Sequence, residues 1–356
     1  MSMNREIYFL LFFVGTVILA IIMTRIVIRL ALRFNIVDSP DQPRKIHSVA
    51  RPKLGGLAIF LTFVIGVGVL AMTVGTGEIS GRRLFGVILG GLFLLIGGVL
   101  DDKYNLRPSQ QIWFPVFAAL AVVVFGNHLS LVTNPLGGAF VLDQAKLWGY
   151  PILGSILVFA WVLGMIYTTK FLDGMDGLVS GVSVIAGLVI FALALKLEVG
   201  QTTNAFLALI FAATCLGFLF FNFHPAKIFL GEAGSTLTGF FIAVLAVVSG
   251  AKIASALLVL GIPVLDVAWV IVQRLWFRSS PFVGDNKHLH FRLLDIGLSQ
   301  RKTVLFLYLL AAAFGGVAVF LQSGGKLLAL LVLSGLMIAV IVAVALIYRK
   351  KAGRAS

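Results

Sequence analysis

The chain has 356 residues, of which 60% are hydrophobic and only 12% are charged, and its mean hydropathy is +1.07. So little polar surface cannot coat a water-soluble globule of this size, and the composition excludes an ordinary soluble enzyme. The net charge of +14 indicates how the chain is oriented in the membrane. The surplus of basic residues can also bind anionic lipid headgroups or an anionic substrate. No nucleic-acid partner is expected.

Apolar runs between charged or Gly/Pro-rich breaks predict an all-α membrane bundle of eleven spans. The first run continues past Arg5 and Glu6 without a small-residue cleavage site, which indicates a retained span rather than a signal peptide. Because no repeat or soluble segment interrupts the runs, residues 1–356 are expected to form one membrane domain. The predicted spans are residues 7–24, 54–73, 84–100, 112–126, 151–166, 177–195, 204–221, 234–249, 252–272, 303–321 and 327–348.

Two shorter features complete the organisation of the chain. Residues 128–151 contain Asn-Pro and Gly-Gly breaks between short apolar stretches, a pattern that predicts a small β-hairpin. The single cysteine, Cys215, lies inside an apolar run. The chain therefore forms no internal disulfide and has no cysteine-based metal site.

Lys and Arg are unevenly divided between the two sides of these spans. The segments that follow the odd-numbered spans hold 21 of the 28 basic residues, and the remaining segments hold 7. Because basic residues accumulate in cytoplasmic segments, the carboxyl terminus is expected in the cytoplasm and the amino terminus outside.

The same topology places seven ionisable side chains at the cytoplasmic ends of five apolar segments. Ionisable groups at the membrane are costly, so their occurrence at one depth indicates a functional site rather than solvated loops. The seven residues are Asp101, Asp102, Asp173, Asp176, Glu232, His288 and His290.

Asp101 and Asp102 directly follow the apolar run FLLIGGVL. Adjacent carboxylates at a helix end repel each other and persist most easily beside a cation or a proton. The alternative is that Lys103 and Arg107 neutralise them in a plain loop.

Asp173 and Asp176 lie in KFLDGMDGLVSG, and a helical turn would place them on one face. Gly174 and Gly177 would let the backbone approach a ligand closely. The alternative is that an Asp here caps the helix that follows.

Glu232 lies in NFHPAKIFLGEAGSTLTGF, just before the Gly234-Ser235 opening of the eighth span. Backbone N–H groups at a helix start suit phosphate oxygens, and a carboxylate there can hold a bridging divalent cation. Phe229 offers a flat face to a base, although packing alone is the more common use of such a ring.

His288, His290 and Arg292 are expected in one short polar loop, within DNKHLHFRLLDIGLSQRK. Imidazole and guanidinium groups suit a pyrophosphate, which needs several directional donors. Two histidines at i and i+2 without a nearby cysteine argue against zinc. A basic loop that only sets topology explains Lys287 and Arg301 but not the histidines.

Five segments, in order, resemble motifs of the polyprenyl-phosphate N-acetylhexosamine-1-phosphate transferases, which are glycosyltransferase family 4. This family includes the WecA and TagO enzymes and is related to the phospho-MurNAc-pentapeptide translocases. The resemblance covers nearly the whole chain. The segments are RKIHSVARPKLGGLAIF (44–60), GGVLDDKYNL (97–106), FLDGMDGL (171–178), FNFHPAKIFLGEAGS (221–235) and HLHFRLLDIGLSQRK (288–302).

The resemblance implies a bundle of ten or eleven spans in the bacterial inner membrane, with the active site facing the cytoplasm. In the implied reaction a polyprenyl phosphate attacks the β-phosphorus of a UDP-N-acetylhexosamine. UMP is released, and the sugar is left on a lipid diphosphate, which is the first membrane step in the synthesis of a cell-surface glycan. Such a transfer depends mainly on positioning and charge neutralisation. Family members are often dimers, so a homodimer is compatible with the resemblance.

Roles for individual residues also follow from the resemblance. Asp101 and Asp102 would handle the acceptor phosphate, one as a base, although a phosphate monoester with a second pKa near 6 is already mostly dianionic at neutral pH. The other implied roles are a nucleotide site for Asp173 and Asp176, stacking on uracil for Phe229, diphosphate binding for His288, His290 and Arg292, and Mg²⁺ coordination for Glu232.

The chain departs from the family pattern at three positions. Lys170 replaces an Asn that helps hold the metal, and an ammonium cannot be a metal ligand unless it loses its proton. Lys170 is therefore expected to pair with Glu232, which replaces the usual Asp, or to contact the diphosphate directly. The cofactor expected from the carboxylate cluster is Mg²⁺. Phe291 stands where related enzymes often have a third histidine.

Two other functions compete with the transfer of N-acetylglucosamine-1-phosphate. Within the family, HLHFRLLDIGLSQ and RPKLGGLAIF favour the N-acetylglucosamine branch over the phospho-MurNAc-pentapeptide transferases. Outside it, broken helices and intramembrane carboxylates also occur in transporters. A transporter needs a site near the bilayer midplane that can be reached from both sides. Here the ionisable groups are predicted at one face, and Asp266 is the only carboxylate within a predicted span. Asp266 is expected to support the cytoplasmic cluster or to reach toward Arg274.

Overall fold

The computed structural model describes residues 2–38, 50–77, 79–134, 138–147, 149–196, 200–250, 253–276, 288–321 and 323–352. The protein is a polytopic helical bundle, as predicted. Over these residues, seven helices are long and apolar enough to cross a membrane, or eight if one bent pair of helices counts as a single span.

Long helices alternate with short connections that contain three small pairs of strands. In the first part of the chain the elements are α1 (Ser2–Arg33), β1 (Val37–Asp38), β2 (Arg51–Pro52), α2 (Gly55–Thr73), α3 (Gly81–Tyr104), α4 (Pro108–Gln111), α5 (Trp113–Val124), β3 (Leu131–Thr133), β4 (Ala139–Val141), β5 (Lys146–Leu147) and β6 (Tyr150–Pro151). The rest are α6 (Ile152–Leu172), α7 (Leu178–Ala194), α8 (Thr202–Asn222), α9 (Gly231–Val248), α10 (Ile253–Val259), α11 (Gly261–Trp276), α12 (Leu289–Asp295), α13 (Gln300–Phe320) and α14 (Ser323–Ala352).

Every one of the eleven predicted apolar runs contains helix. Three of the corresponding helices or helix pairs, α4–α5, α7 and α14, hold apolar stretches shorter than a full span. The number of eleven membrane crossings and the orientation of the termini therefore stay predictions.

The ninth predicted span, 252–272, differs from expectation because it is broken. Helices α10 and α11 meet there at an angle of 82°. Pro263 has no backbone N–H to donate to the carbonyl of Val259, and Gly261 is a poor helix former, so the hydrogen-bond ladder is interrupted at this point. The bend changes the direction of α11, the helix that carries Asp266.

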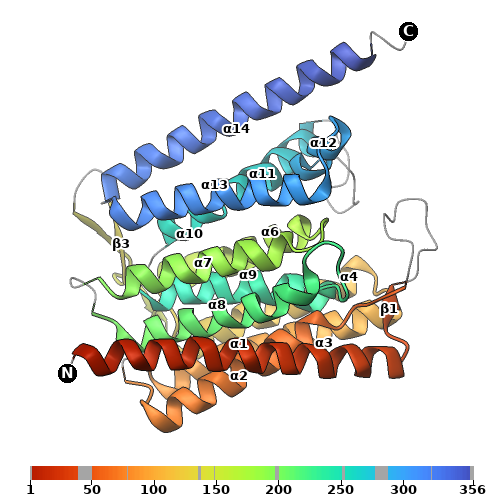
Figure 1. The fold of residues 1–356 in the computed structure, drawn as a ribbon. Helices are drawn as coiled ribbons and strands as arrows, with labels where there is room; N and C mark the ends of the chain where they lie inside the picture. The colour runs from red at the N-terminus through yellow and green to blue at the C-terminus, as the bar shows by residue number, and fades with distance from the viewer. Residues whose placement is uncertain are drawn as a thin grey trace.

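The long helices lie side by side, with α8 and α9 innermost and α1, α13 and α14 toward the outside (Figure 1). Helix α9 packs against α2, α3, α6 and α7. Helix α1 begins at the end of the bundle that carries β3, whereas α14 ends on the side that carries α4 and α12 (Figure 1).

The predicted hairpin within 128–151 is confirmed as two antiparallel pairs. Strands β3 and β4 pair through Leu131 with Val141, and β5 and β6 pair through Leu147 with Tyr150. A third pair, β1 with β2, lies at the opposite end of the bundle (Figure 1). It brings residues 37–38 next to residues 51–52.

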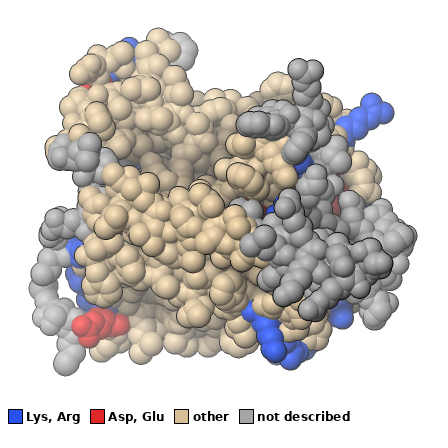
Figure 2. All heavy atoms as spheres, turned by 90° about the horizontal axis from the view of Figure 1, so that it is seen from above, with Lys and Arg blue, Asp and Glu red and all other residues tan. Residues whose placement is uncertain are grey.

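The outer surface has the character expected of a protein in lipid. Large apolar side chains such as Met72, Leu309 and Phe320 point outward from the helices. Figure 2 shows an uncharged band across the molecule, with the visible charged side chains at its two ends. Lipid tails can solvate this band, whereas the charged ends suit the two aqueous faces.

Candidate active site

A cavity of about 600 Å³ opens at the end of the bundle that carries α4. Its walls come from segments that are far apart in the sequence: the β1–β2 pair, the ends of α3 and α6, the loop after α6, and the turn before α9. Seven of the predicted site residues line it: Asp101, Asp102, Lys170, Asp173, Asp176, Phe229 and Glu232.

Asp101 and Asp102 lie in the last turn of α3, which ends where Asn105 adopts a left-handed conformation. The Asp101 carboxylate accepts hydrogen bonds from the Leu106 backbone N–H at 2.9 Å and from Gln111 Nε2 at 2.5 Å. Asp102 Oδ2 accepts from the Glu232 backbone N–H at 3.0 Å. Both carboxylates are therefore held by N–H donors.

Gly231 makes the contact between α3 and α9 possible. Its φ is +69°, and a Cβ at this position would collide with the Lys53 carbonyl oxygen and with Asp102 Oδ2. Glycine is the residue that tolerates this conformation at low cost. Helix α9 can therefore begin against Asp102 and place Glu232 in its first turn.

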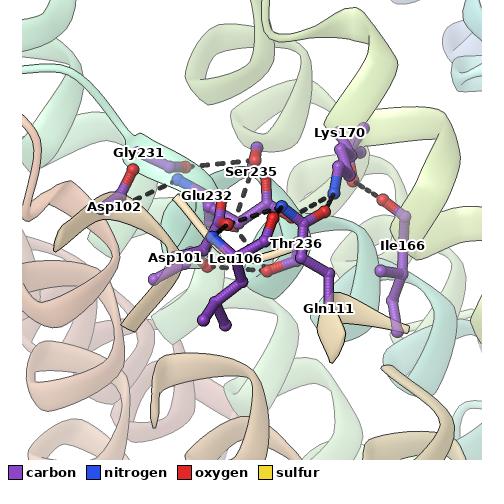
Figure 3. Close-up of polar contacts among 12 residues, drawn as sticks. Asp101, Asp102, Leu106, Gln111, Ile166, Lys170, Gly231, Glu232, Ser235 and Thr236 are labelled. Carbon is purple, nitrogen blue, oxygen red and sulfur yellow. Dashed lines mark hydrogen bonds and ion pairs between the residues drawn. The ribbon is translucent and has the colours of Figure 1, made fainter. Parts of the chain in front are cut away.

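Lys170 and Glu232 form an ion pair across the cavity wall, as Figure 3 shows. Lys170, in the last turn of α6, places its Nζ 2.5 Å from Glu232 Oε1 and 3.1 Å from Gln111 Oε1. Both charged side chains are half-buried. Of the two expectations for Lys170, pairing with Glu232 is the one that these contacts match.

Asp173 and Asp176 lie in the loop between α6 and α7, so the prediction of a helical turn is wrong here. The prediction of an Asp cap also fails, because the N-cap of α7 is Gly177, with a φ of +81°. Asp176 Oδ2 accepts from the Ala226 N–H at 3.0 Å and lies 2.8 Å from His224 Nδ1. Asp176 thereby ties the loop to the turn before α9.

Asp173 has an environment that favours its neutral form. Burial, followed by the nearby carboxylates of Glu232 and Asp176, raises the pKa of Asp173 to about 8. The carboxyl group is then mostly protonated at neutral pH in the ligand-free protein. It can donate a hydrogen bond to a phosphate oxygen as well as accept one.

Phe229 and two basic residues form the wall beside β2. The Phe229 backbone N–H donates to Pro52 O at 2.8 Å, and its carbonyl accepts from the Gly55 N–H at 3.1 Å. Lys53 Nζ lies 3.1 Å from Asp38 Oδ1, and Arg51 also lines the cavity. This wall therefore combines an aromatic ring with two cations.

His288, His290 and Arg292 do not line the cavity. The expected loop is instead the short helix α12, with His288 at its N-cap, and Phe291 is the α12 residue that lines the cavity wall. Arg292 is half-buried in the same helix. The imidazole rings of His288 and His290 are parallel, with centroids 5.8 Å apart.

The two histidines are held in different ways. His288 Nδ1 lies 2.8 Å from Asp266 Oδ2, and the Leu289 N–H donates to Asp266 Oδ1 at 2.9 Å. Burial lowers the pKa of His290 to about 4, so its ring is neutral at pH 7. His290 Nε2 faces Gly174 and has no hydrogen-bond partner among the described residues. The histidines thus lie directly behind the loop that carries Asp173.

The residues present do not fit a Mg²⁺ site. Mg²⁺ prefers an octahedral set of oxygen ligands that includes carboxylates. The part of the chain that the structure describes contains no group of three or more Asp, Glu, His or Cys side chains placed to hold a metal. The expected ligand, Glu232, is instead bound to the ammonium of Lys170.

Sequence reasoning missed Gln111 and His224 as parts of this site. His224 lies inside a segment that matches a family motif, so this match was a usable signal. Gln111 had none, because a single Gln at the start of an apolar run is common. Asp266 was expected to support the cluster, and it does so through His288.

A helical membrane protein with a cavity of carboxylates and cations at one end belongs to a class that handles charged substrates at the membrane surface. The family model for glycosyl transferase family 4 matches residues 84–250. The chain is 32% identical to the probable undecaprenyl-phosphate N-acetylglucosaminyl 1-phosphate transferase of Bacillus subtilis, over 93% of this chain and 89% of that protein.

Two further relatives extend the comparison. The chain is 33% identical to the decaprenyl-phosphate N-acetylglucosaminephosphotransferase of Mycobacterium tuberculosis, over 81% of this chain and 77% of that protein. It is 30% identical to the phospho-N-acetylmuramoyl-pentapeptide-transferase of Moorella thermoacetica, over 76% and 84%. The chain belongs to glycosyl transferase family 4, the polyprenyl-phosphate N-acetylhexosamine-1-phosphate transferases, and the predicted resemblance is confirmed.

Proposed function

We propose that this protein transfers N-acetylglucosamine-1-phosphate from UDP-N-acetylglucosamine to a polyprenyl phosphate such as undecaprenyl phosphate. An oxygen of the polyprenyl phosphate forms a bond to the β-phosphorus of the nucleotide sugar. The bond from that phosphorus to the bridging oxygen breaks, and UMP leaves with its electron pair. The product is a lipid diphosphate that carries the sugar, the first membrane intermediate of a cell-surface glycan.

The observation that supports this proposal most is the cavity itself. Its lining combines carboxyl groups from α3, α9 and the loop after α6 with three cations, Arg51, Lys53 and Lys170. Two phosphate-bearing substrates need this combination of positive charge and fixed hydrogen-bonding groups. The relatives from Bacillus subtilis and Mycobacterium tuberculosis are named for the same class of reaction, the transfer of N-acetylglucosamine phosphate to a polyprenyl phosphate.

Five of the lining residues receive the following roles in the proposal. Asp101 and Asp102 orient the acceptor phosphate at the end of α3, and Phe229 stacks on the uracil ring. Asp173 hydrogen-bonds to the nucleotide, while Asp176 holds the turn that contains His224 and Ala226.

The residues of α12 act from behind the cavity wall. His290 faces Gly174 from that side, and Phe291 forms part of the wall. We therefore assign His288 and His290 a positioning role on the loop after α6. Arg292 lies on the same helix and does not line the cavity, so the proposal gives it no direct contact with the diphosphate.

The proposed orientation follows the distribution of basic residues. The residues that line the cavity belong to elements at the end of the bundle opposite β3, where α4 and β1 lie (Figure 1), and they include described residues of four predicted cytoplasmic segments: Lys53, Asp101, Lys170 and His224. The protein would therefore work in the bacterial inner membrane with its cavity facing the cytoplasm, where nucleotide sugars are made. A homodimer is compatible with this arrangement.

The decisive experiment is an assay of purified protein with undecaprenyl phosphate and a panel of UDP-sugars, scored for UMP release. UMP release with UDP-N-acetylglucosamine and not with UDP-MurNAc-pentapeptide is expected. The opposite preference would assign the chain to the pentapeptide transferases. Sugar flux into liposomes without UMP release would instead indicate a transporter.

A further inference from the structure

The ammonium group of Lys170 occupies a defined position in the cavity wall. It contacts Glu232 Oε1 at 2.5 Å and Gln111 Oε1 at 3.1 Å, and it lies 6.0 Å from the centre of the Tyr167 ring. An ammonium has three N–H donors. Two are accounted for by these contacts among the described residues, which leaves the third for a ligand.

Gln111 has only one orientation that satisfies all of its neighbours. Its Nε2 donates to Asp101 Oδ1 at 2.5 Å and to Leu106 O at 3.1 Å, and both of these atoms can only accept. Its Oε1 is therefore left to accept from Lys170. The Gln111 side-chain amide therefore cannot flip without breaking all three of these hydrogen bonds.

The side chains of Asp101, Gln111, Lys170 and Glu232 thus form one continuous chain of polar contacts (Figure 3). This polar chain joins the ends of α3, α4, α6 and α9. At its far end, the Glu232 backbone N–H donates to Asp102. A positive charge is therefore fixed between the two carboxyl groups at the end of α3 and the loop of Asp173.

This arrangement conflicts with a divalent metal bound at Glu232. A metal on that carboxylate would lie close to the Lys170 ammonium, and the two cations would repel each other. Displacing Lys170 would also remove the donor to Gln111 Oε1 and so disturb Asp101, which accepts from the same amide. The ammonium already supplies positive charge at this position.

We propose that the Lys170 ammonium, held by Gln111 and Glu232, takes the place of a divalent metal ion in this enzyme, so that the transfer proceeds without one. The inference rests on the proposed function. As the bond from the β-phosphorus to the bridging oxygen breaks, negative charge grows on the departing UMP. The free N–H of Lys170 stabilises this charge, with Lys53 and Arg51 in the same cavity as further cations.

The first test compares rates of UMP release by full-length protein in excess EDTA and in millimolar Mg²⁺. The wild-type rates are expected to agree within about twofold, a negligible difference in barrier. Lys170→Gln is expected to lower the rate about 10²-fold or more under both conditions, as removal of one transition-state donor does. A wild-type rate that is lost in EDTA and restored by Mg²⁺ would overturn the proposal.

A matched control is available at the opposite end of the bundle. Lys146 pairs with Asp143 at 3.7 Å in the exposed segment of β5, outside the cavity. Lys146→Gln therefore removes a lysine from an ion pair without touching the site, and its rate is expected to equal that of wild type. The double variant Lys170→Asn with Glu232→Asp restores the usual family pair, an amide oxygen and a shorter carboxylate, which can both be ligands of Mg²⁺. Its activity is expected to appear only when Mg²⁺ is added.

Binding provides a readout that does not depend on turnover. The affinity of wild-type protein for UDP-N-acetylglucosamine, measured by calorimetry, is expected to be the same in EDTA and in Mg²⁺. Lys170→Gln is expected to weaken it about tenfold, the loss typical of one charged hydrogen bond. Metal-dependent binding by wild type would refute the metal-free site. Metal-free binding without UMP release under any condition would instead refute the proposed reaction and leave the Lys170 site standing.

Discussion

Asp266 holds His288 by two contacts at once, one to the ring and one to the backbone beside it. Its Oδ2 lies 2.8 Å from His288 Nδ1, and its Oδ1 accepts from the Leu289 N–H at 2.9 Å. Both side chains are almost fully buried. A carboxylate in this position fixes the Nδ1–H tautomer of the histidine and the start of α12.

This relationship predicts a loss of activity in Asp266→Asn. The variant keeps the shape of the side chain, but its amide group can present N–H to a ring nitrogen that also carries a proton. The rate of UMP release is expected to fall about tenfold or more, because the ring must change its tautomer.

Asp266→Ala should also lower the free energy of unfolding by about 1–3 kcal/mol, because it leaves buried donors unpaired. Fluorescence-detected thermal unfolding would measure this loss. Asp143→Asn, in an exposed pair at the opposite end, is the control. A normal rate in Asp266→Asn would show that the pair does not serve the site.

Three of the carboxyl groups that line the cavity and are assigned to the substrates are expected to be indispensable. Asp101→Asn, Asp102→Asn and Asp173→Asn should each reduce UMP release about 10²-fold or more, because each removes a fixed polar contact in the cavity. Gel filtration in detergent would verify that each variant is folded. Near-normal rates in all three variants would refute the assignment of the cavity as the active site.

His290 predicts a pH dependence of stability. The pKa of its ring is lowered to about 4 in the folded protein by burial, whereas an unfolded chain has an ordinary histidine near 6.5. Between these values the unfolded state binds more protons, so stability falls as the pH drops from about 6.5 to about 4. Above about 6.5 this contribution is constant.

The measurement is the midpoint of thermal unfolding at pH 7 and at pH 5, for wild type and for His290→Gln. Wild type should lose more stability on acidification than the variant, whose side chain does not titrate. Equal losses in the two proteins would indicate that His290 is not buried in its neutral form.

Phe229 predicts a defect in nucleotide binding rather than in the chemical step. Phe229→Ala should raise KM for the UDP-sugar by the equivalent of about 1–3 kcal/mol, the value of one base stacked on an aromatic ring. Phe229→Tyr keeps the flat face and should restore most of the affinity. An unchanged KM in Phe229→Ala would mean that the ring only packs against β2.

The sequence predicts the helical bundle and its charged end because both depend on composition and spacing. Long apolar runs specify helices in lipid, and Asp101, Asp173 and Glu232 were recognisable because carboxyl groups at the ends of such runs are unusual. The bend at Pro263 and the loop around Asp176 were not predicted. Both depend on local backbone geometry that packing against other helices decides.

The same limit applies to the histidines and to Gln111. His288 and His290 were placed in a loop, but they belong to a helix of only seven residues, which is too short for a periodic signal. Gln111 matters because α4 happens to end beside α6, and a long-range contact of this kind has no trace in local spacing. The resemblance to family motifs therefore identifies the histidines, but it does not predict the side chains that they contact.

The position of α9 constrains how the protein is assembled. This helix is among the most buried in the bundle, yet it is synthesised after α2, α3 and α6, which pack around it. Its neighbours therefore have to stay apart in the membrane, or separate again, until α9 enters between them. Until then Lys170 has no Glu232 to pair with, so the ion pair in the cavity wall can form only when α9 packs into the bundle.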